Sequence, residues 1–208
     1  MTQTPDPAEP GPRQHAATPG ASGEQMFADP VQIRALAHPV RLELLGHLDD
    51  VGTATATECA AAIGESVASC SYHLRILARH GYIEQVQQPG REKPWKTVAL
   101  HRSHVIDPEA PGSVHAVSAV AAIEVDRQLR RIQSWLRRSP ALPPEDLEVS
   151  TVHEARAYAT HEEILQLRQD LWQLARRFEG RWENPDQRPE GAVPVRLFSV
   201  LNVDPGQE

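Results

Sequence analysis

The sequence predicts an α+β fold that is mostly α, on two observations. Residues 29–100 carry apolar residues at helical spacing, interrupted by Gly and Pro and followed by two stretches typical of strands. Residues 114–208 carry two long amphipathic segments on either side of a proline-rich run. We therefore expect a compact domain over residues 29–100 and a helical or α+β region over residues 114–208, joined by a linker over residues 101–113.

Length, net charge and composition limit the number of domains and the class of protein further. Its 208 residues at net charge −7 suit one or two small domains with sizeable cores. Residues 1–28 are rich in Pro, Gly, Ala and Thr without a periodic apolar pattern, and predict a disordered tail. No apolar run reaches the length of a membrane span and the N-terminus lacks a hydrophobic signal segment, so we expect a cytoplasmic protein without a membrane partner. Two cysteines argue against a disulfide framework.

Short helices are expected before Gly64. Asp29 followed by Pro30 provides a cap and a first-turn proline, and Pro39 should interrupt the opening helix because it lacks the N–H needed to continue. Thr57 is expected to cap the next helix, and Gly64 to end it in the left-handed conformation. The residues expected to pack inward are Val40, Leu44, Leu45, Leu48, Ala60, Ala61 and Ile63.

The helix that follows should have two different faces, with Ser66 as its cap and Gly81 at its end. Helical spacing predicts a buried face of Val67, Cys70, Leu74 and Leu77. Small and hydroxylated side chains on the other face suit close approach to base edges, and arginines suit phosphate or guanine. That outer face carries Ala68, Ser69, Ser71, Tyr72, Arg75 and Arg79.

A basic hairpin is predicted next, with strands at residues 82–86 and 95–100 and a turn at Pro89-Gly90. Helix, turn, helix and hairpin in this order predict a winged helix-turn-helix, whose second helix enters the DNA major groove. Residues 66–100 are net positive although the chain is acidic, and a local patch is what steers a protein to phosphates. The predicted contacts to double-stranded DNA are Ser66, Ser69, Ser71, Tyr72, His73, Arg75, Arg79, Arg91, Lys93 and Lys96.

Three stretches resemble ArsR-like transcriptional regulators. Residues 34–45 (Arg-Ala-Leu-Ala-His-Pro-Val-Arg-Leu-Glu-Leu-Leu) look like the opening helix of that family. Residues 71–77 and the segment from Arg91 to Trp95 resemble the same family. The resemblance covers about residues 29–100, and it implies a dimeric DNA-binding repressor or regulator that responds to a signal it does not identify.

The C-terminal region should supply the dimer contacts. Residues 114–138 predict a helix with one apolar stripe, and Thr160 with Glu163 fits a capping box for a helix reaching about Arg181. Apolar residues of this last helix alternate in steps of three and four, which is typical of a coiled-coil seam. Strands are expected within residues 147–158 and 193–201. The predicted dimerisation residues are Leu129, Ile132, Leu136, Ile164, Leu167, Leu171, Leu174 and Phe178.

A small organic effector is a further candidate partner. Four aromatic residues of this region are expected to line an apolar pocket for it, although their helical spacing fits an ordinary core or a dimer interface at least as well. They are Trp135, Tyr158, Trp172 and Phe178.

The sequence predicts no metal, cofactor or catalytic site. Some ArsR-like proteins sense metals through two cysteines one residue apart, but here Ala61 stands where the partner of Cys59 would be. Cys59, Cys70 and His73 are a conceivable soft-metal site, but buried cysteine commonly acts as a small hydrophobe. A Gly-rich phosphate loop, a nucleophile elbow and a zinc-protease helix are all missing. A solvated helix start explains a second group of polar residues better than a metal does: His153, His161, Glu162 and Glu163.

The leading hypothesis is a sequence-specific DNA-binding transcriptional regulator, a repressor that binds a palindromic operator as a homodimer. The alternative is a winged-helix protein-interaction module, an anti-regulator or a scaffold that binds no operator. Salt-dependent DNA binding distinguishes the two.

Overall fold

The computed structural model describes residues 18–19, 25–87, 93–182 and 184–203. The chain divides into two compact units, Met1–Arg127 and Gln128–Glu208. The division falls inside the long helix α5 (Ser113–Arg138) and not at the expected linker. Within the described ranges, no helix is long and apolar enough to cross a membrane.

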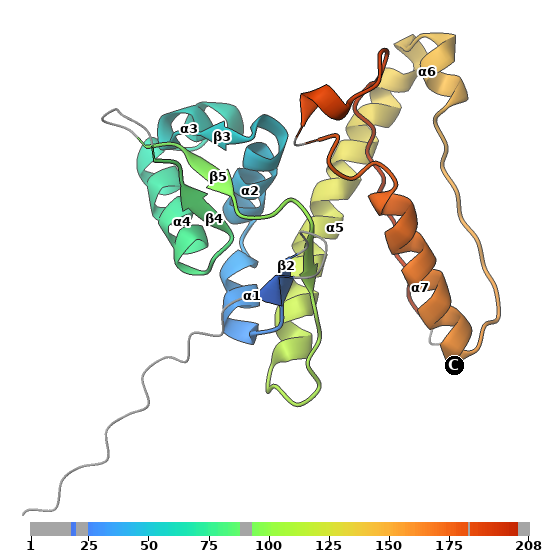
Figure 1. The fold of residues 1–208 in the computed structure, drawn as a ribbon, viewed down its shortest axis with the longest axis horizontal. Helices are drawn as coiled ribbons and strands as arrows, with labels where there is room; N and C mark the ends of the chain where they lie inside the picture. The colour runs from blue at the N-terminus through green and yellow to red at the C-terminus, as the bar shows by residue number, and fades with distance from the viewer. Residues whose placement is uncertain (1–17, 20–24, 88–92, 183, 204–208) are drawn as a thin grey trace, which may run out of the picture. The chain divides into compact units, whose positions relative to one another are not determined.

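The first unit contains the helices α1 (Pro30–Leu36), α2 (Pro39–Val51), α3 (Ala56–Ile63) and α4 (Val67–Arg79), which are labelled in Figure 1. The expected interruption at Pro39 is confirmed, because α1 ends at Leu36 and Pro39 begins α2. The caps at Asp29 and Ser66 are confirmed as well, since each side chain accepts a backbone N–H of its helix.

The predicted cap of α3 is wrong by two residues. Thr55, not Thr57, accepts the backbone N–H of Glu58, while the Glu58 carboxylate accepts the N–H of Thr55 at 2.7 Å. This reciprocal pair forms because Glu58 lies at the third helical position counted from Thr55, which satisfies two N–H groups at once. Gly64 ends α3 with φ +74°, as predicted.

The wing is a three-stranded antiparallel sheet with the order β3-β5-β4. Its strands are β3 (Thr53–Ala54), β4 (Ile83–Gln85) and β5 (Trp95–Thr97). The two predicted strands are therefore confirmed, although both are shorter than expected. The turn predicted at Pro89-Gly90 lies outside the described residues.

A second small sheet occupies segments expected to be tail and linker. Its strands are β1 (Thr18–Pro19), β2 (Gln25–Phe27) and β6 (Arg102–His104), and β2 runs parallel to β6. Phe27 is fully buried, and its ring stacks on Tyr82 at a centroid distance of 4.2 Å. Burial of this aromatic ring corrects the expectation of disorder at residues 25–27, because the ring gains far more by packing than by exposure to water.

The core of the first unit gathers the apolar faces of these elements. The N-terminal half of α5 joins it through Ala116 and Val120, so this helix begins as part of the first unit. Ala61, predicted to pack inward, is exposed, and Ile63 and Val40 are only partly buried. The helical residues that are buried include Ile33, Leu36, Leu42, Leu44, Leu45, Leu48, Cys59, Ala60, Cys70, Leu74 and Leu77.

The second unit contains the remainder of α5, then η1 (Ser139–Ala141), α6 (Pro144–Glu148), α7 (His161–Arg176) and η2 (Pro185–Gln187). The capping box of Thr160 and Glu163 is confirmed, and α7 ends at Arg176, earlier than predicted. The strands expected within residues 147–158 and 193–201 are wrong: residues 147–148 end α6, and residues 149–158 and 193–201 are irregular and mostly exposed. A strand needs a partner for its backbone N–H and C=O groups, and neither segment is paired in the single chain.

Candidate nucleic-acid interface

Helix α4 presents one face to the core and one to solvent. Cys70, Leu74 and Leu77 are buried as predicted, but Val67 is 45% exposed. Val67 is the first residue of α4, just after the Ser66 cap, and its side chain lines a surface groove rather than the core. The exposed face of α4 therefore begins at its first residue.

The outer face of α4 carries a few polar side chains among mostly small residues. Tyr72 is 56% exposed, Arg75 and Arg79 are exposed, and Ser69 and Ser71 are half-buried. The Ser66 hydroxyl accepts the N–H of Ser69 at 3.1 Å, which satisfies a backbone donor at the helix start. Nε of Arg75 donates to the Ser71 carbonyl at 3.1 Å, so the arginine side chain lies back along its own helix.

A groove of about 250 Å³ lies where α3 and α4 meet the wing. Its helical side is formed by Val67, Ser71 and Arg75, and its wing side by Gln85, Lys93 and Trp95. Residues far apart in sequence, predicted separately as recognition helix and wing, thus line one surface. This arrangement allows a nucleic-acid strand to contact helix and wing together.

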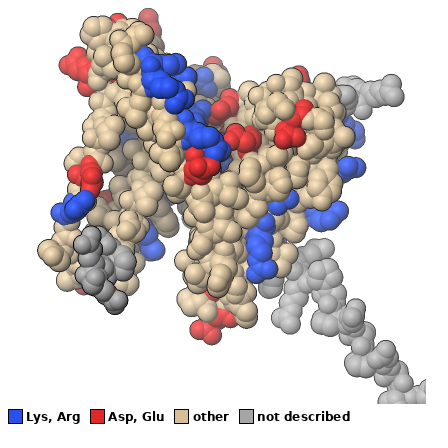
Figure 2. Space-filling view, turned by 180° about the vertical axis from the view of Figure 1, so that it is seen from behind, with Lys and Arg blue, Asp and Glu red and all other residues tan. Residues whose placement is uncertain are grey.

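The basic residues of the wing differ in whether a carboxylate already pairs with their charge. Nζ of Lys96 on β5 lies 3.0 Å from the Glu84 carboxylate on β4, in an exposed cross-strand pair. Lys93 is exposed, and Arg91 lies outside the described residues. In Figure 2 several Lys and Arg side chains are scattered over the right-hand side of the molecule. Lys93 and the arginines of α4 therefore offer phosphates more uncompensated charge than Lys96 does.

His73 does not lie on this surface, which corrects its assignment as a DNA contact. It is only 9% exposed, and its ring packs against His38 with a centroid distance of 4.5 Å. Burial, with His38 and Arg41 nearby, lowers the pKa of His73, so the ring is neutral at pH 7. The sequence already carried the signal, because position 73 falls three residues after Cys70 and four before Leu77 on the inward face.

Arg41 is a candidate that the sequence reasoning did not assign. It lies on α2, and its charge acts on Tyr72, His38 and His73. Its Nε is buried without a hydrogen-bond partner, and burial lowers the pKa of the guanidinium. Arg41 therefore brings a cation beneath the outer face of α4. Its place within residues 34–45 gave no indication of this, because contacts between helices are not encoded in spacing along one helix.

The two cysteines occupy the core, as expected. Both are fully buried, and burial raises the pKa of the Cys59 thiol to about 11 and that of Cys70 above its ordinary value. A thiol held protonated is a poor metal ligand and a poor nucleophile. Across the described ranges, three or more His, Cys, Asp or Glu side chains are nowhere grouped to hold a metal ion. Glu163 serves the cap of α7, where hydrogen bonds from Thr160 lower its pKa.

Neither of the two cavities of the first unit is lined by the aromatic residues expected to form an effector pocket. Tyr158 is fully exposed. The guanidinium of Arg168 covers Trp172 at 5.4 Å, and that of Arg181 covers Phe178 at 5.0 Å. Trp172 and Phe178 thus each lie beside an arginine cation.

Two kinds of comparison with known proteins find a match. Residues 36–86 match the model of a helix-turn-helix domain family, a stretch that runs from the end of α1 through β4. A crystal structure of an ArsR family transcriptional regulator aligns with 49% of this chain and 96% of its own, at 26% identity. The TM-score of that alignment, 0.29, is too low to establish a shared overall fold. No curated protein matches the chain.

Proposed function

We propose that this chain, whose residues 36–86 match a helix-turn-helix domain, is an ArsR-like DNA-binding regulator that binds a palindromic operator as a homodimer and represses transcription there. The observation that carries the proposal is the surface shared by α4 and the wing, where Ser71, Arg75, Lys93 and Trp95 line one groove. The resemblance to ArsR-like regulators supports repression of transcription as the effect of operator binding.

Helix α4 reads the bases in this proposal. Ala68 and Ser69 are small enough for the first turns of α4 to approach base edges closely. Tyr72 follows on the same face, with an exposed hydroxyl that both donates and accepts hydrogen bonds. Specificity then comes from Ser69, Ser71, Tyr72 and Arg75, while Ser66 caps the helix that presents them.

Arg79 and Lys93 hold the phosphate backbone on either side of that contact. Both are exposed cations, and charge contacts of this kind position a protein without reading sequence. Arg91 joins them from the wing. Lys96 contributes less, because Glu84 already pairs with it.

A homodimer supplies a second copy of α4, which would bind the second half-site of the operator. Apolar side chains of α5, of α7 and of the turn after α7 are exposed in the single chain, among them Leu129, Leu136, Leu174 and Phe178. Exposed apolar residues repeated along a helix favour association. Two copies of α4 about 34 Å apart would meet successive major grooves of a palindrome.

The test begins with selection of bound duplexes from a random library by the full chain, followed by gel-shift titration at several salt concentrations. We expect a palindromic consensus, with affinity that falls steeply as salt rises. A matched duplex with one half-site scrambled should bind much more weakly.

Recovery of no consensus, together with weak salt-independent binding, would overturn the proposal. That result would favour the alternative, in which the winged helix binds another protein.

A further inference from the structure

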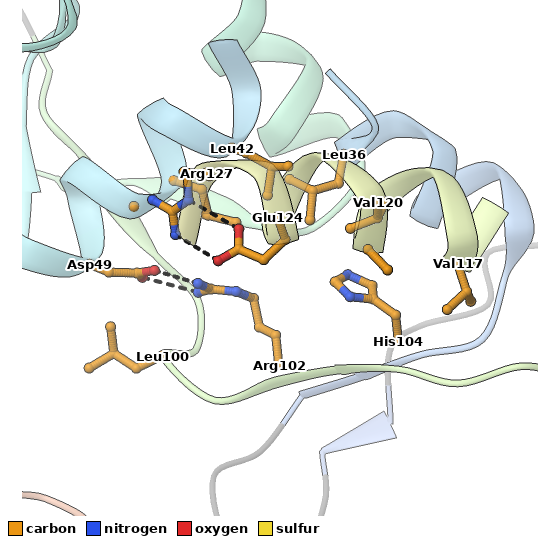
Figure 3. A pocket seen from close by; sticks show the side chains of 13 residues that line it. Leu36, Leu42, Asp49, Leu100, Arg102, His104, Val117, Val120, Glu124 and Arg127 are labelled. Atoms are coloured by element: carbon orange, nitrogen blue, oxygen red, sulfur yellow. Dashed lines mark hydrogen bonds and ion pairs between the residues drawn. The ribbon is translucent and has the colours of Figure 1, made fainter. Parts of the chain in front are cut away.

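A second cavity lies within the first unit, away from α4 and the wing. Its volume is about 380 Å³, and residues from α2, β6 and α5 line it. Figure 3 shows charged side chains toward one end, with Asp49 beside Arg102 and Glu124 beneath Arg127. Val117, Val120 and the ring of His104 lie toward the other end. The cavity is thus amphipathic, and its volume falls in the range of small-molecule sites.

The charges at the polar end balance. Arg102 pairs with Asp49, and Nε of Arg127 lies 3.1 Å from a Glu124 oxygen. All four side chains are less than one third exposed. His104 adds no charge at pH 7, because burial and the nearby Arg102 lower its pKa to about 4. Two cations and two anions therefore meet in one partly desolvated space.

Gly46 of α2 makes room for the Arg127 side chain at this site. Gly46 lies in the interior of that helix, where glycine costs about 1 kcal/mol relative to alanine. A Cβ at this position would lie only 2.2 Å from Nη1 of Arg127. The missing side chain makes room for the guanidinium to lie against α2, next to the cavity.

A ligand for this cavity must match both its charge and its apolar wall. A ligand with a net charge would leave that charge without a partner among side chains that are already balanced. A zwitterion brings one charge of each sign, so its carboxylate can accept from a guanidinium while its ammonium donates to a carboxylate. An apolar side chain would then pack on Leu36, Val117 and Val120.

We propose that this cavity binds a small zwitterionic amphipath of the class of α-amino acids with an apolar side chain. Arg102 and Arg127 bind its carboxylate, and Asp49 and Glu124 bind its ammonium group. The site lies one helix away from the DNA-facing surface, because α2 lines the cavity and also packs against α3 and α4. The proposal concerns binding to the chain itself and does not depend on DNA binding.

The first test compares three probes that share one phenyl ring. Phenylalanine carries both charges, 3-phenylpropanoate only the carboxylate, and 2-phenylethylamine only the ammonium. Isothermal titration of the full chain should show saturable binding of phenylalanine at one site per chain. Each single-charge probe should bind about tenfold more weakly or worse, the equivalent of one charge-assisted hydrogen bond. Equal affinities for the three probes, or no saturable binding of phenylalanine, would overturn the proposal.

The second test places the ligand in this cavity. Ala121 lines it and is exposed, whereas its neighbour Ala122 is equally exposed and does not line it. Ala121→Trp should abolish phenylalanine binding, and the matched control Ala122→Trp should leave it unchanged. Unchanged binding in a folded Ala121→Trp chain, checked by circular dichroism, would show that the ligand binds elsewhere.

The third test changes the charge balance without filling the cavity. Arg127→Gln should weaken phenylalanine binding about tenfold and strengthen that of 2-phenylethylamine, because the lining becomes net negative. Glu124→Gln should instead favour 3-phenylpropanoate. Loss of general packing would weaken all probes alike, so the opposite shifts in preference identify the charges as the ligand contacts. Parallel changes for every probe in both variants would overturn the proposal.

Discussion

Single residues of the surface that we propose faces DNA differ in what they offer a duplex. Tyr72 projects a ring and a hydroxyl from the middle of α4, whereas Lys93 offers a charge from the wing. His73, one residue after Tyr72, is buried against His38. Neighbouring positions of one helix thus serve recognition and core packing in turn, because each step rotates the side chain by about 100°.

Tyr72→Ala and Lys93→Ala should therefore weaken DNA binding in different ways. Loss of Tyr72 should cost about 1–3 kcal/mol on the selected operator and much less on random duplex. Loss of Lys93 should weaken both duplexes alike and reduce the slope of log affinity against log salt by about one phosphate contact. Gel-shift titration across salt concentrations measures both effects. Equal, sequence-independent losses from the two variants would contradict these roles.

His104 should make the stability of the first unit depend on pH. Its pKa is lowered to about 4 from 6.5, chiefly by burial, so the folded chain binds fewer protons than the unfolded chain between these values. The stability is fully present above pH 6.5 and falls as pH drops toward 4, by about 2 kcal/mol from pH 7 to 5. Urea titrations at these two pH values measure it.

His104→Gln removes this titration and should reduce the pH dependence. It should not abolish it, because burial also lowers the pKa values of His38, His73 and His80. The matched control is His115→Gln, at an exposed position of the same unit. An unchanged difference between pH 7 and 5 in His104→Gln would contradict the assignment.

The cysteines should affect stability and not signalling. Cys59→Ser places a hydroxyl at a fully buried position, and should cost about 1–3 kcal/mol of unfolding free energy. Zinc, arsenite and mild oxidant should leave operator affinity unchanged, because both thiols are held protonated. Release of the operator by one of these reagents, abolished in a folded Cys59→Ser/Cys70→Ser chain, would show that the cysteines sense it.

At the scale of elements, local chemistry decided what the sequence could predict. The cap at Ser66, the break at Pro39 and the capping box at Thr160 each depend on residues within a few positions. Strand β2 depends instead on a partner far along the chain, since Gln25 pairs with Arg102. A three-residue strand is too short to show alternation, so a proline-rich tail was the natural interpretation of its sequence.

The candidate nucleic-acid interface shows the same difference between features set by nearby residues and features set by distant partners. Helical periodicity predicted the exposure of Tyr72, Arg75 and Arg79, because one helix determines its own faces. The Lys96 pair with Glu84 depends on strand register, and the approach of Arg41 to Tyr72 depends on how α2 packs. Neither relation follows from spacing within a single element.

Phe27 should make β2 necessary for the stability of the first unit. Phe27→Ala removes a fully buried ring stacked on Tyr82, and should destabilise the chain by about 3–5 kcal/mol. Met26 on the same strand is 43% exposed, so Met26→Ala serves as the matched control and should cost far less. Chemical denaturation followed by fluorescence measures both. Equal small losses would indicate that β2 only rests on the surface.

At the scale of the whole molecule, the two units differ in how completely a single chain buries their apolar side chains. The first unit has a continuous core that runs from Phe27 to Val120. The second leaves apolar residues exposed along α7 and in the irregular segment from Val193 to Val203. Exposure of that many apolar side chains is unusual for a chain that acts alone, and a second copy is the partner we propose for them.

Leu174 allows the dimer to be tested without loss of the fold. It is 50% exposed on α7, so Leu174→Asp removes little packing within the chain. In a dimer the same change would bury an unpaired carboxylate, which costs several kcal/mol. Sedimentation velocity should therefore show a dimer for the unaltered chain and a folded monomer for Leu174→Asp, with operator affinity lost because two half-sites are no longer bound together. Gln173→Asp introduces the same charge at an adjacent exposed position and should remain dimeric. A dimeric Leu174→Asp chain with full operator affinity would place the interface away from this face of α7.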